Sequence, residues 1–125
     1  MYSRPSDPEA AYDLFCRGSR LLGDGHPHQA ATVLTRAKLL EPEKGSIREA
    51  LGRALLLAGR ASSARREFAK AVRIDPVNDY AHFGLALACE RTGERRRALA
   101  HLRLAVAMRP GVEHYERALE RLTRR

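Results

Sequence analysis

Small and large apolar residues recur along the chain with a period of 34 residues. Pro42, Pro76 and Pro110 stand at that spacing, and each closes a similar stretch of sequence. Counting back from each proline gives the same residue class at each offset: Ala30, Ala64 and Ala98, then Leu34, Phe68 and Leu102, then Ala37, Ala71 and Ala105. Within a unit these positions are spaced i, i+4 and i+7, which is one stripe of a helix. A strict period of this length predicts a solenoid, that is, a stack of helical hairpins.

Glycines and prolines set the predicted ends of the helices. Gly25, Gly59 and Gly93 mark a turn inside each hairpin, and the prolines mark the turns that close the hairpins. The predicted helices cover residues 8–22, 27–40, 46–58, 61–74, 79–92 and 94–108. Asp7 is predicted to cap the first of them, and Ser46 with Glu49 has the spacing of a capping box at the third.

A last amphipathic segment follows Pro110. Val112, Tyr115, Leu119 and Leu122 fall on one face of it, which predicts a capping helix over about residues 112–124 for the open end of the stack. The predicted organisation is therefore a short flexible N-terminus, residues 1–7, followed by a single domain, residues 8–125. Within this domain the repeats are expected at about residues 11–44, 45–78 and 79–112.

Composition narrows the class of protein. A chain of 125 residues is long enough for one domain of about three repeats, and its two cysteines are too few for a disulfide scaffold. No stretch approaches the length of a membrane span, and the first residues lack the apolar region of a secretory signal. We therefore expect a cytoplasmic protein. The net charge of +8 lies almost wholly after residue 59.

Residues 11–110 resemble three tetratricopeptide repeats. The second repeat carries the residues Leu51, Gly52, Leu55, Gly59, Ala64, Phe68, Ala71 and Pro76 that match the family's small and large positions. The resemblance implies an all-α fold, a right-handed superhelical stack of helix-turn-helix repeats. Two features depart from the family pattern. Leu14, Arg48 and His82 stand where the family often has tryptophan, and Arg17 stands at a usually apolar position, so the first hairpin is either looser or meets something outside the domain.

The resemblance also implies a concave groove, lined by the second, fifth, ninth and twelfth residues of each repeat. Carried over by position, the lining residues are Tyr12, Phe15, Ser19 and Leu22; Ser46, Glu49, Arg53 and Leu56; and Tyr80, Phe83, Leu87 and Glu90. The aromatic pairs in the first and third repeats favour an apolar or amphipathic segment of a partner. In the alternative interpretation, these rings pack against neighbouring hairpins or the capping helix.

The groove lacks the residues with which chaperone-binding members of the family clamp a C-terminal carboxylate. Those positions hold Phe15, Ser19, Ala50, Arg53, Tyr80 and Gly84, so a two-carboxylate clamp is not predicted. Arg53 pairs either with one acidic group on a ligand or with Glu49 one helical turn away, and the internal pair is favoured. If the groove binds a partner, Phe15→Glu with Phe83→Glu is expected to abolish capture while the helices survive.

The predicted function is that of a protein-interaction module, an adaptor or scaffold that binds a peptide or helix of a partner protein. Two alternatives remain open. The first is a basic surface on the second helices that binds nucleic acid or another polyanion, although no base-stacking aromatics accompany it. Its basic residues are Arg65, Arg66, Lys70, Arg73, Arg95, Arg96, Arg97, Arg103 and Arg109. The second is homo-oligomerisation through the groove or through the outer side of the first hairpin, which no polar capping helix precedes.

No catalytic or metal-ligand constellation is found in the sequence, so neither an enzyme nor a cofactor is predicted. His26, His28, His82 and His101 are interpreted as capping or surface residues, because no cysteine or carboxylate joins them at a metal-ligand spacing. Cys89 is interpreted as a small apolar core residue.

Overall fold

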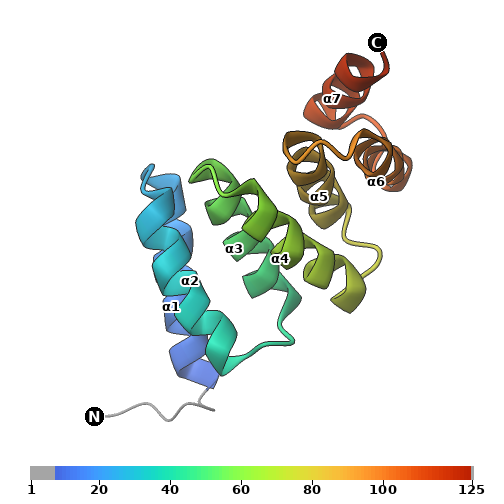
Figure 1. Ribbon diagram of the computed structural model, residues 1–125. Coiled ribbons are helices and arrows are strands. Elements are labelled where there is room, and N and C mark those ends of the chain that lie inside the picture. Colours follow the sequence, from blue (N-terminus) through green and yellow to red (C-terminus); the bar gives the residue numbers. More distant parts are fainter. Residues whose placement is uncertain (1–7, 125) are drawn as a thin grey trace.

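A computed structural model describes residues 8–124, and these form seven α-helices and no strand (Figure 1). The helices are α1 (Pro8–Gly23), α2 (Pro27–Leu40), α3 (Gly45–Leu57), α4 (Ala61–Ile74), α5 (Asp79–Arg91), α6 (Arg95–Met108) and α7 (Glu113–Thr123). Each end lies within one residue of its predicted position. The predicted flexible segment 1–7 and the Asp7 cap lie outside the described residues.

The helices pair into three antiparallel hairpins that follow one another along the stack, with the two chain ends at opposite ends of it (Figure 1). Gly25, Gly59 and Gly93 adopt φ angles of +82°, +83° and +81°, a region that residues with a side chain rarely enter, and this fixes the turn inside each hairpin. The alanines of the recurring stripe are fully buried, so the two helices of a hairpin approach closely. The predicted solenoid is confirmed.

Side-chain caps contribute less than the sequence suggests. The predicted capping box of Ser46 and Glu49 is wrong, because α3 begins one residue earlier and Lys44 occupies the N-cap position without a side-chain bond. The carboxylate of Glu49 instead accepts a hydrogen bond of 3.1 Å from Asn78 Nδ2. Asn78 is itself a cap, since its Oδ1 accepts from the backbone N–H of Ala81 at the start of α5.

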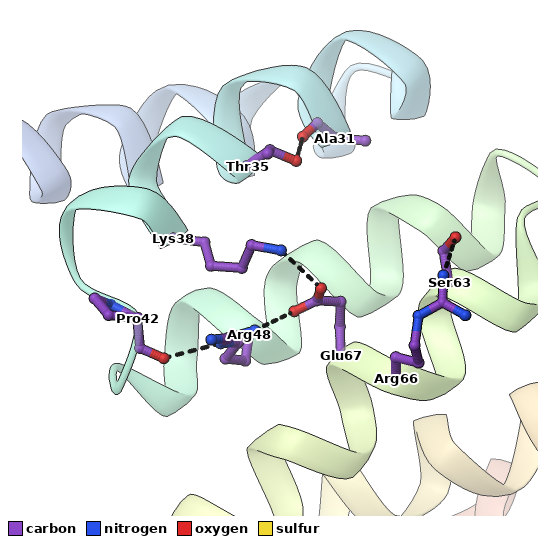
Figure 2. A network of polar contacts seen from close by, with 8 residues as sticks. All are labelled: Ala31, Thr35, Lys38, Pro42, Arg48, Ser63, Arg66 and Glu67. Atoms are coloured by element: carbon purple, nitrogen blue, oxygen red, sulfur yellow. Dashed lines mark hydrogen bonds and ion pairs between the residues drawn. The ribbon is translucent and has the colours of Figure 1, made fainter.

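The first and second hairpins are joined by a carboxylate that two cations share. Glu67 of α4 lies between Lys38 of α2 and Arg48 of α3, with an N···O distance of 3.0 Å to each (Figure 2). Arg48 also donates from Nε to the carbonyl oxygen of Pro42, at 2.9 Å, and so binds the turn between the hairpins. All three charged side chains are largely shielded from water, and this strengthens their attraction.

The outer face of α1 is polar at positions where the inner helices are apolar. Ile47, Leu51 and Ala54 of α3, and Ala81, Leu85 and Ala88 of α5, are buried. One period earlier, the matching positions of α1 hold Asp13, Arg17 and Arg20, and all three are exposed. Arg17 is therefore explained as an end-of-stack residue. These three positions form no apolar stripe of the kind that the inner hairpins bury.

Candidate functional site

The first hollow on the side of the predicted groove lies where the start of α1 meets the turn between α2 and α3. We call it the N-terminal hollow. It has a volume of about 490 Å³ and is lined by Ala11, Tyr12, Phe15, Glu41, Lys44, Ser46 and Ile47. Tyr12 is 64% exposed although it is aromatic, whereas Phe15 is half-buried against the core. The hollow thus combines an accessible aromatic ring with a lysine and a glutamate at its edge.

A second hollow, the central hollow, is built on α3, α5 and the start of α7. Its volume is about 700 Å³, and its lining is Arg53, Asp79, Tyr80, Phe83, Arg109, Val112, His114 and Tyr115. Asp79 is already engaged, because the Tyr115 hydroxyl donates to its Oδ2 at 2.6 Å and Arg109 Nε lies 3.3 Å from the same oxygen. Burial, followed by this hydrogen bond, raises the pKa of Tyr115, which keeps its hydroxyl protonated as the donor.

Arg53 supplies the unpaired positive charge of the central hollow. The predicted pair with Glu49 is wrong, since the Glu49 carboxylate accepts from Asn78 and Arg53 forms no ion pair within residues 8–124. Burial raises the pKa of Tyr80, the charge of Arg53 acts in the opposite direction, and the charge of Glu49 raises it. Arg53 and Tyr80 line the same hollow. With Asp79 neutralised by Arg109, the hollow carries a net positive charge.

The third hollow, the C-terminal hollow, lies between α5 and α7 and has a volume of about 520 Å³. Phe83, Leu87, His114, Arg117, Ala118, Glu120, Arg121 and Arg124 line it. Its charges are largely paired already. Arg121 bonds Glu90 of α5, Arg117 bonds Glu113 at 2.7 Å, and Arg124 bonds Glu120 at 2.8 Å.

The predicted groove residues divide into two groups. Tyr12, Phe15, Ser46, Arg53, Tyr80, Phe83 and Leu87 line one of these three hollows. Leu22 and Leu56 are instead buried in the core, and Glu49 and Glu90 are held by Asn78 and Arg121. Ser19 is exposed but lines none of the three. The sequence missed His114 and Arg109, which enter through α7 and the turn before it, because the repeat pattern was carried over only to the three hairpins.

Phe83 is covered rather than open. Its ring stacks on Tyr115 of α7 with a centroid distance of 4.6 Å and meets the edge of His114 at 5.2 Å, and the residue is only 9% exposed. The prediction that this ring is free for a partner is therefore wrong, and the alternative of packing against the capping helix holds at this position. Tyr12, which has no such cover, remains the accessible aromatic residue.

The basic residues of α4 and α6 are partly used within the fold. Lys70 pairs with Glu43 at 3.1 Å, Arg65 and Arg97 both pair with Glu94, and Arg95 donates to the carbonyl oxygen of Leu122. Arg66 donates to the Ser63 hydroxyl at 3.3 Å (Figure 2). The exposed arginines of these two helices that have no ion pair inside the described range are Arg66, Arg73, Arg95, Arg96 and Arg103, and of these Arg95 is bonded to the carbonyl oxygen of Leu122. The basic surface is thus smaller than the sequence suggests.

His26 and His28 are exposed, as expected of surface residues, whereas His82 and His101 differ from the roles predicted for them. His82 is 4% exposed and bonds His101, so neither residue is a cap. His26 stands at the N-cap of α2 but makes no side-chain cap bond. Cys89 is fully buried, as predicted, and burial raises the pKa of its thiol, which keeps it protonated and unreactive. Within residues 8–124, no group of three or more potential ligands is arranged to hold a metal ion.

Comparisons with known proteins agree with this architecture. Two family models, both described as tetratricopeptide repeat, match residues 17–79 and 55–122. No curated protein sequence matches the chain. None of the described helices has the length and apolar character needed to cross a bilayer.

Among solved structures, the tetratricopeptide repeat domain of Arabidopsis OM64 is similar, with 23% identity, a TM-score of 0.89, and coverage of 92% of this chain and 95% of that one. The first such domain of Spaghetti (RPAP3), solved with the HSP90 peptide SRMEEVD, has 14% identity and a TM-score of 0.89, with coverage of 96% and 95%. YrrB, described as having an unusual peptide-binding site, has 23% identity and a TM-score of 0.81, with coverage of 88% and 57%.

Proposed function

The chain belongs to the tetratricopeptide repeat family, and from this premise we propose that it is a non-catalytic adaptor whose concave groove binds a segment of another protein. The segment places an apolar side chain in the N-terminal hollow and an acidic group beside Arg53 in the central hollow. The unpaired charge of Arg53 carries this proposal, because a guanidinium with no internal partner at the edge of an aromatic hollow complements a carboxylate.

Three observations support a peptide or helix as the ligand. Residues of the first helices α1, α3 and α5 line the hollows, which is where a segment bound in the groove would lie. Their volumes of about 490 and 700 Å³ suit side chains rather than a whole folded domain. Aromatic and arginine side chains, which dominate binding energies at protein interfaces, are the accessible groups in both. Related domains whose titles name bound peptides make this mode of binding plausible by analogy.

A selection from a displayed library of random twelve-residue peptides, made on the immobilised chain, tests the proposal. We expect the enriched peptides to combine an aromatic or aliphatic residue with an aspartate or glutamate. Tyr12→Ala and Arg53→Gln are each expected to weaken binding of a synthetic enriched peptide by at least about tenfold, since each removes a contact of more than 1 kcal/mol. The dissociation constants are measured by fluorescence anisotropy.

The matched controls are Arg66→Gln and Leu39→Ala, which remove an exposed arginine and an exposed leucine outside the three hollows. Both are expected to leave the dissociation constant within about twofold. Tyr12 and Arg53 are exposed, so their replacement should not alter the helical circular dichroism. If the enriched peptides bind the Tyr12→Ala, Arg53→Gln double variant as tightly as the parent chain, the groove is not their binding site.

A further inference from the structure

The three hairpins share a contact between equivalent positions, but residues of a different chemical type make it in each hairpin. A residue in the first helix of each hairpin meets the residue 19 positions later in the second helix. In the third hairpin this pair is His82 and His101, and in the second it is Arg48 and Glu67. One further period back, the pair is Leu14 and Val33, which share one apolar cluster. The contact is therefore apolar in the first hairpin, an ion pair in the second and a histidine pair in the third.

The ion pair of the second hairpin and the histidine pair of the third make equivalent bonds. Arg48 donates to Glu67 at 3.0 Å and to the carbonyl oxygen of Pro42 at 2.9 Å (Figure 2). His82 contacts His101 with 3.0 Å between the two Nδ1 atoms, and its Nε2 lies 2.9 Å from the carbonyl oxygen of Pro76. Each pair thus joins both helices of its hairpin to the turn that precedes the hairpin. The imidazole rings are stacked, with centroids 5.2 Å apart.

The hydrogen-bond chemistry fixes where the protons of the histidine pair lie. The carbonyl oxygen of Pro76 can only accept, so Nε2 of His82 carries a proton and donates it. In neutral His82, Nδ1 is then a bare acceptor, and the proton between the rings belongs to Nδ1 of His101. A further proton on Nε2 of His101 leaves both bonds in place. A proton on Nδ1 of His82 would set two N–H groups and two positive charges against each other at 3.0 Å.

No hydrogen bond or ion pair within residues 8–124 joins a carboxylate to this pair. Burial lowers the pKa of His101, and the charges of His82 and then Arg97 lower it further. Arg97 is bonded to Glu94, and the nearest acidic residues in sequence to His82 are engaged elsewhere, Asp79 with Tyr115 and Arg109 and Asp75 with the N–H of Val77. On α4, Val72 occupies the position that the cation Lys38 has one period earlier. The ionised carboxylate that satisfies the second hairpin has no counterpart in the third.

We propose that the His82–His101 contact is a pH-sensitive closure of the third hairpin, which holds α5 and α6 to the Pro76 turn when the pair carries no more than one extra proton and releases them when both rings are charged. The other two hairpins carry an ion pair and an apolar contact at this place, without a histidine, so acidification acts on one repeat of the stack. The device is a property of the fold and holds whether or not the groove binds a peptide.

The direction of the pH effect follows from the lowered pKa of His101. The unfolded chain binds the proton at the ordinary value of 6.5, and the folded chain binds it only at lower pH. Stability is therefore complete above about pH 6.5 and declines as the pH falls from there through the pKa of the folded state. The loss falls between the neutral range and mildly acidic conditions, where histidines act as switches.

The test replaces the histidine pair by the residue pairs that the other two hairpins hold at the same positions. His82→Arg with His101→Glu installs the pair of the second hairpin, and His82→Leu with His101→Val installs that of the first. Thermal unfolding is followed by circular dichroism at about pH 7.5 and about pH 5.5. We expect the parent chain to lose about 5 °C more of its Tm on acidification than either replacement variant. His114→Gln, which removes a histidine outside the pair, is the matched control and should keep the full loss. Equal losses in all four proteins would overturn the proposal.

A measurement on the parent chain stands independently of how the variants fold. Nitrogen-15 spectra of the imidazoles should show protonated Nε2 and bare Nδ1 in His82, and protonated Nδ1 in His101, at neutral pH. Hydrogen exchange, corrected for the intrinsic rate, should rise on acidification in α5 and α6 more than in α1 to α4. Two imidazoles that titrate independently of each other would contradict the proposal.

Discussion

Gly84→Ala is expected to destabilise the domain by about 3 kcal/mol, although alanine is the better helix former. A Cβ atom at this position of α5 would lie 2.3 Å from Cε1 of Phe68, a distance that non-bonded carbons do not reach. Phe68 is fully buried in α4 and cannot turn aside, because Gly52 of its own hairpin also lies against its ring. The added methyl group must therefore push α5 away from the second hairpin. Urea unfolding followed by circular dichroism measures the loss.

Phe68→Leu is the second arm of this test. The recurring position holds leucine in the other hairpins, and the sites equivalent to Gly84 there hold Ala50 and Ala118. Leucine with alanine is thus an arrangement that the chain already uses twice. We expect the double variant Gly84→Ala, Phe68→Leu to be more stable than Gly84→Ala alone, with a coupling energy of at least about 1 kcal/mol. Gly23→Ala, where nothing lies within 4 Å of the added Cβ, is the control and should cost nothing. Additive losses would show that the ring and the glycine are not in conflict.

The sequence predicted the positions of the helices better than the contacts that individual side chains make. A repeat of 34 residues with glycine and proline at fixed places determines where helices begin and end, and the helix bounds follow within one residue. The burial of an individual groove residue depends on whether an element outside its own repeat packs over it. Phe15 and Phe83 share one repeat position, yet Phe83 stacks on a ring of α7, which lies outside the repeats.

The histidine pair was missed for a different reason. Taken singly, neither His82 nor His101 has a cysteine or carboxylate at a metal-ligand spacing in the sequence, so its own neighbourhood indicates no contact. The available signal was the complementary charge of Arg48 and Glu67 at the same two positions one period earlier. Opposite charges at matched positions of a repeat indicate a contact, and that contact carries over to whatever residues occupy the positions in the next repeat.

Phe83→Glu is expected to cost about 4 kcal/mol of unfolding free energy, so it cannot serve as a simple probe of partner binding. The substitution removes a large buried ring, breaks its stack on Tyr115, and brings a carboxylate into an apolar contact between α5 and α7. Tyr115 is itself only 3% exposed, so the stack of the two rings is part of the buried contact between α5 and α7. Release of α7 would in turn free Glu90 and Asp79 from their partners Arg121 and Tyr115.

Limited trypsin digestion distinguishes this outcome from a general loss of structure. Arg117 and Arg121 lie on α7 and Arg124 follows its last residue, so displacement of that helix should make cleavage there faster than in α1 to α4. Phe15→Glu is the matched control at the same repeat position, and because its ring is partly exposed we expect a loss of no more than about 1.5 kcal/mol. If the two variants unfold at the same urea concentration, the stack of Phe83 on Tyr115 contributes nothing to the attachment of α7, and the capping helix is held by Leu119 and Leu122 instead.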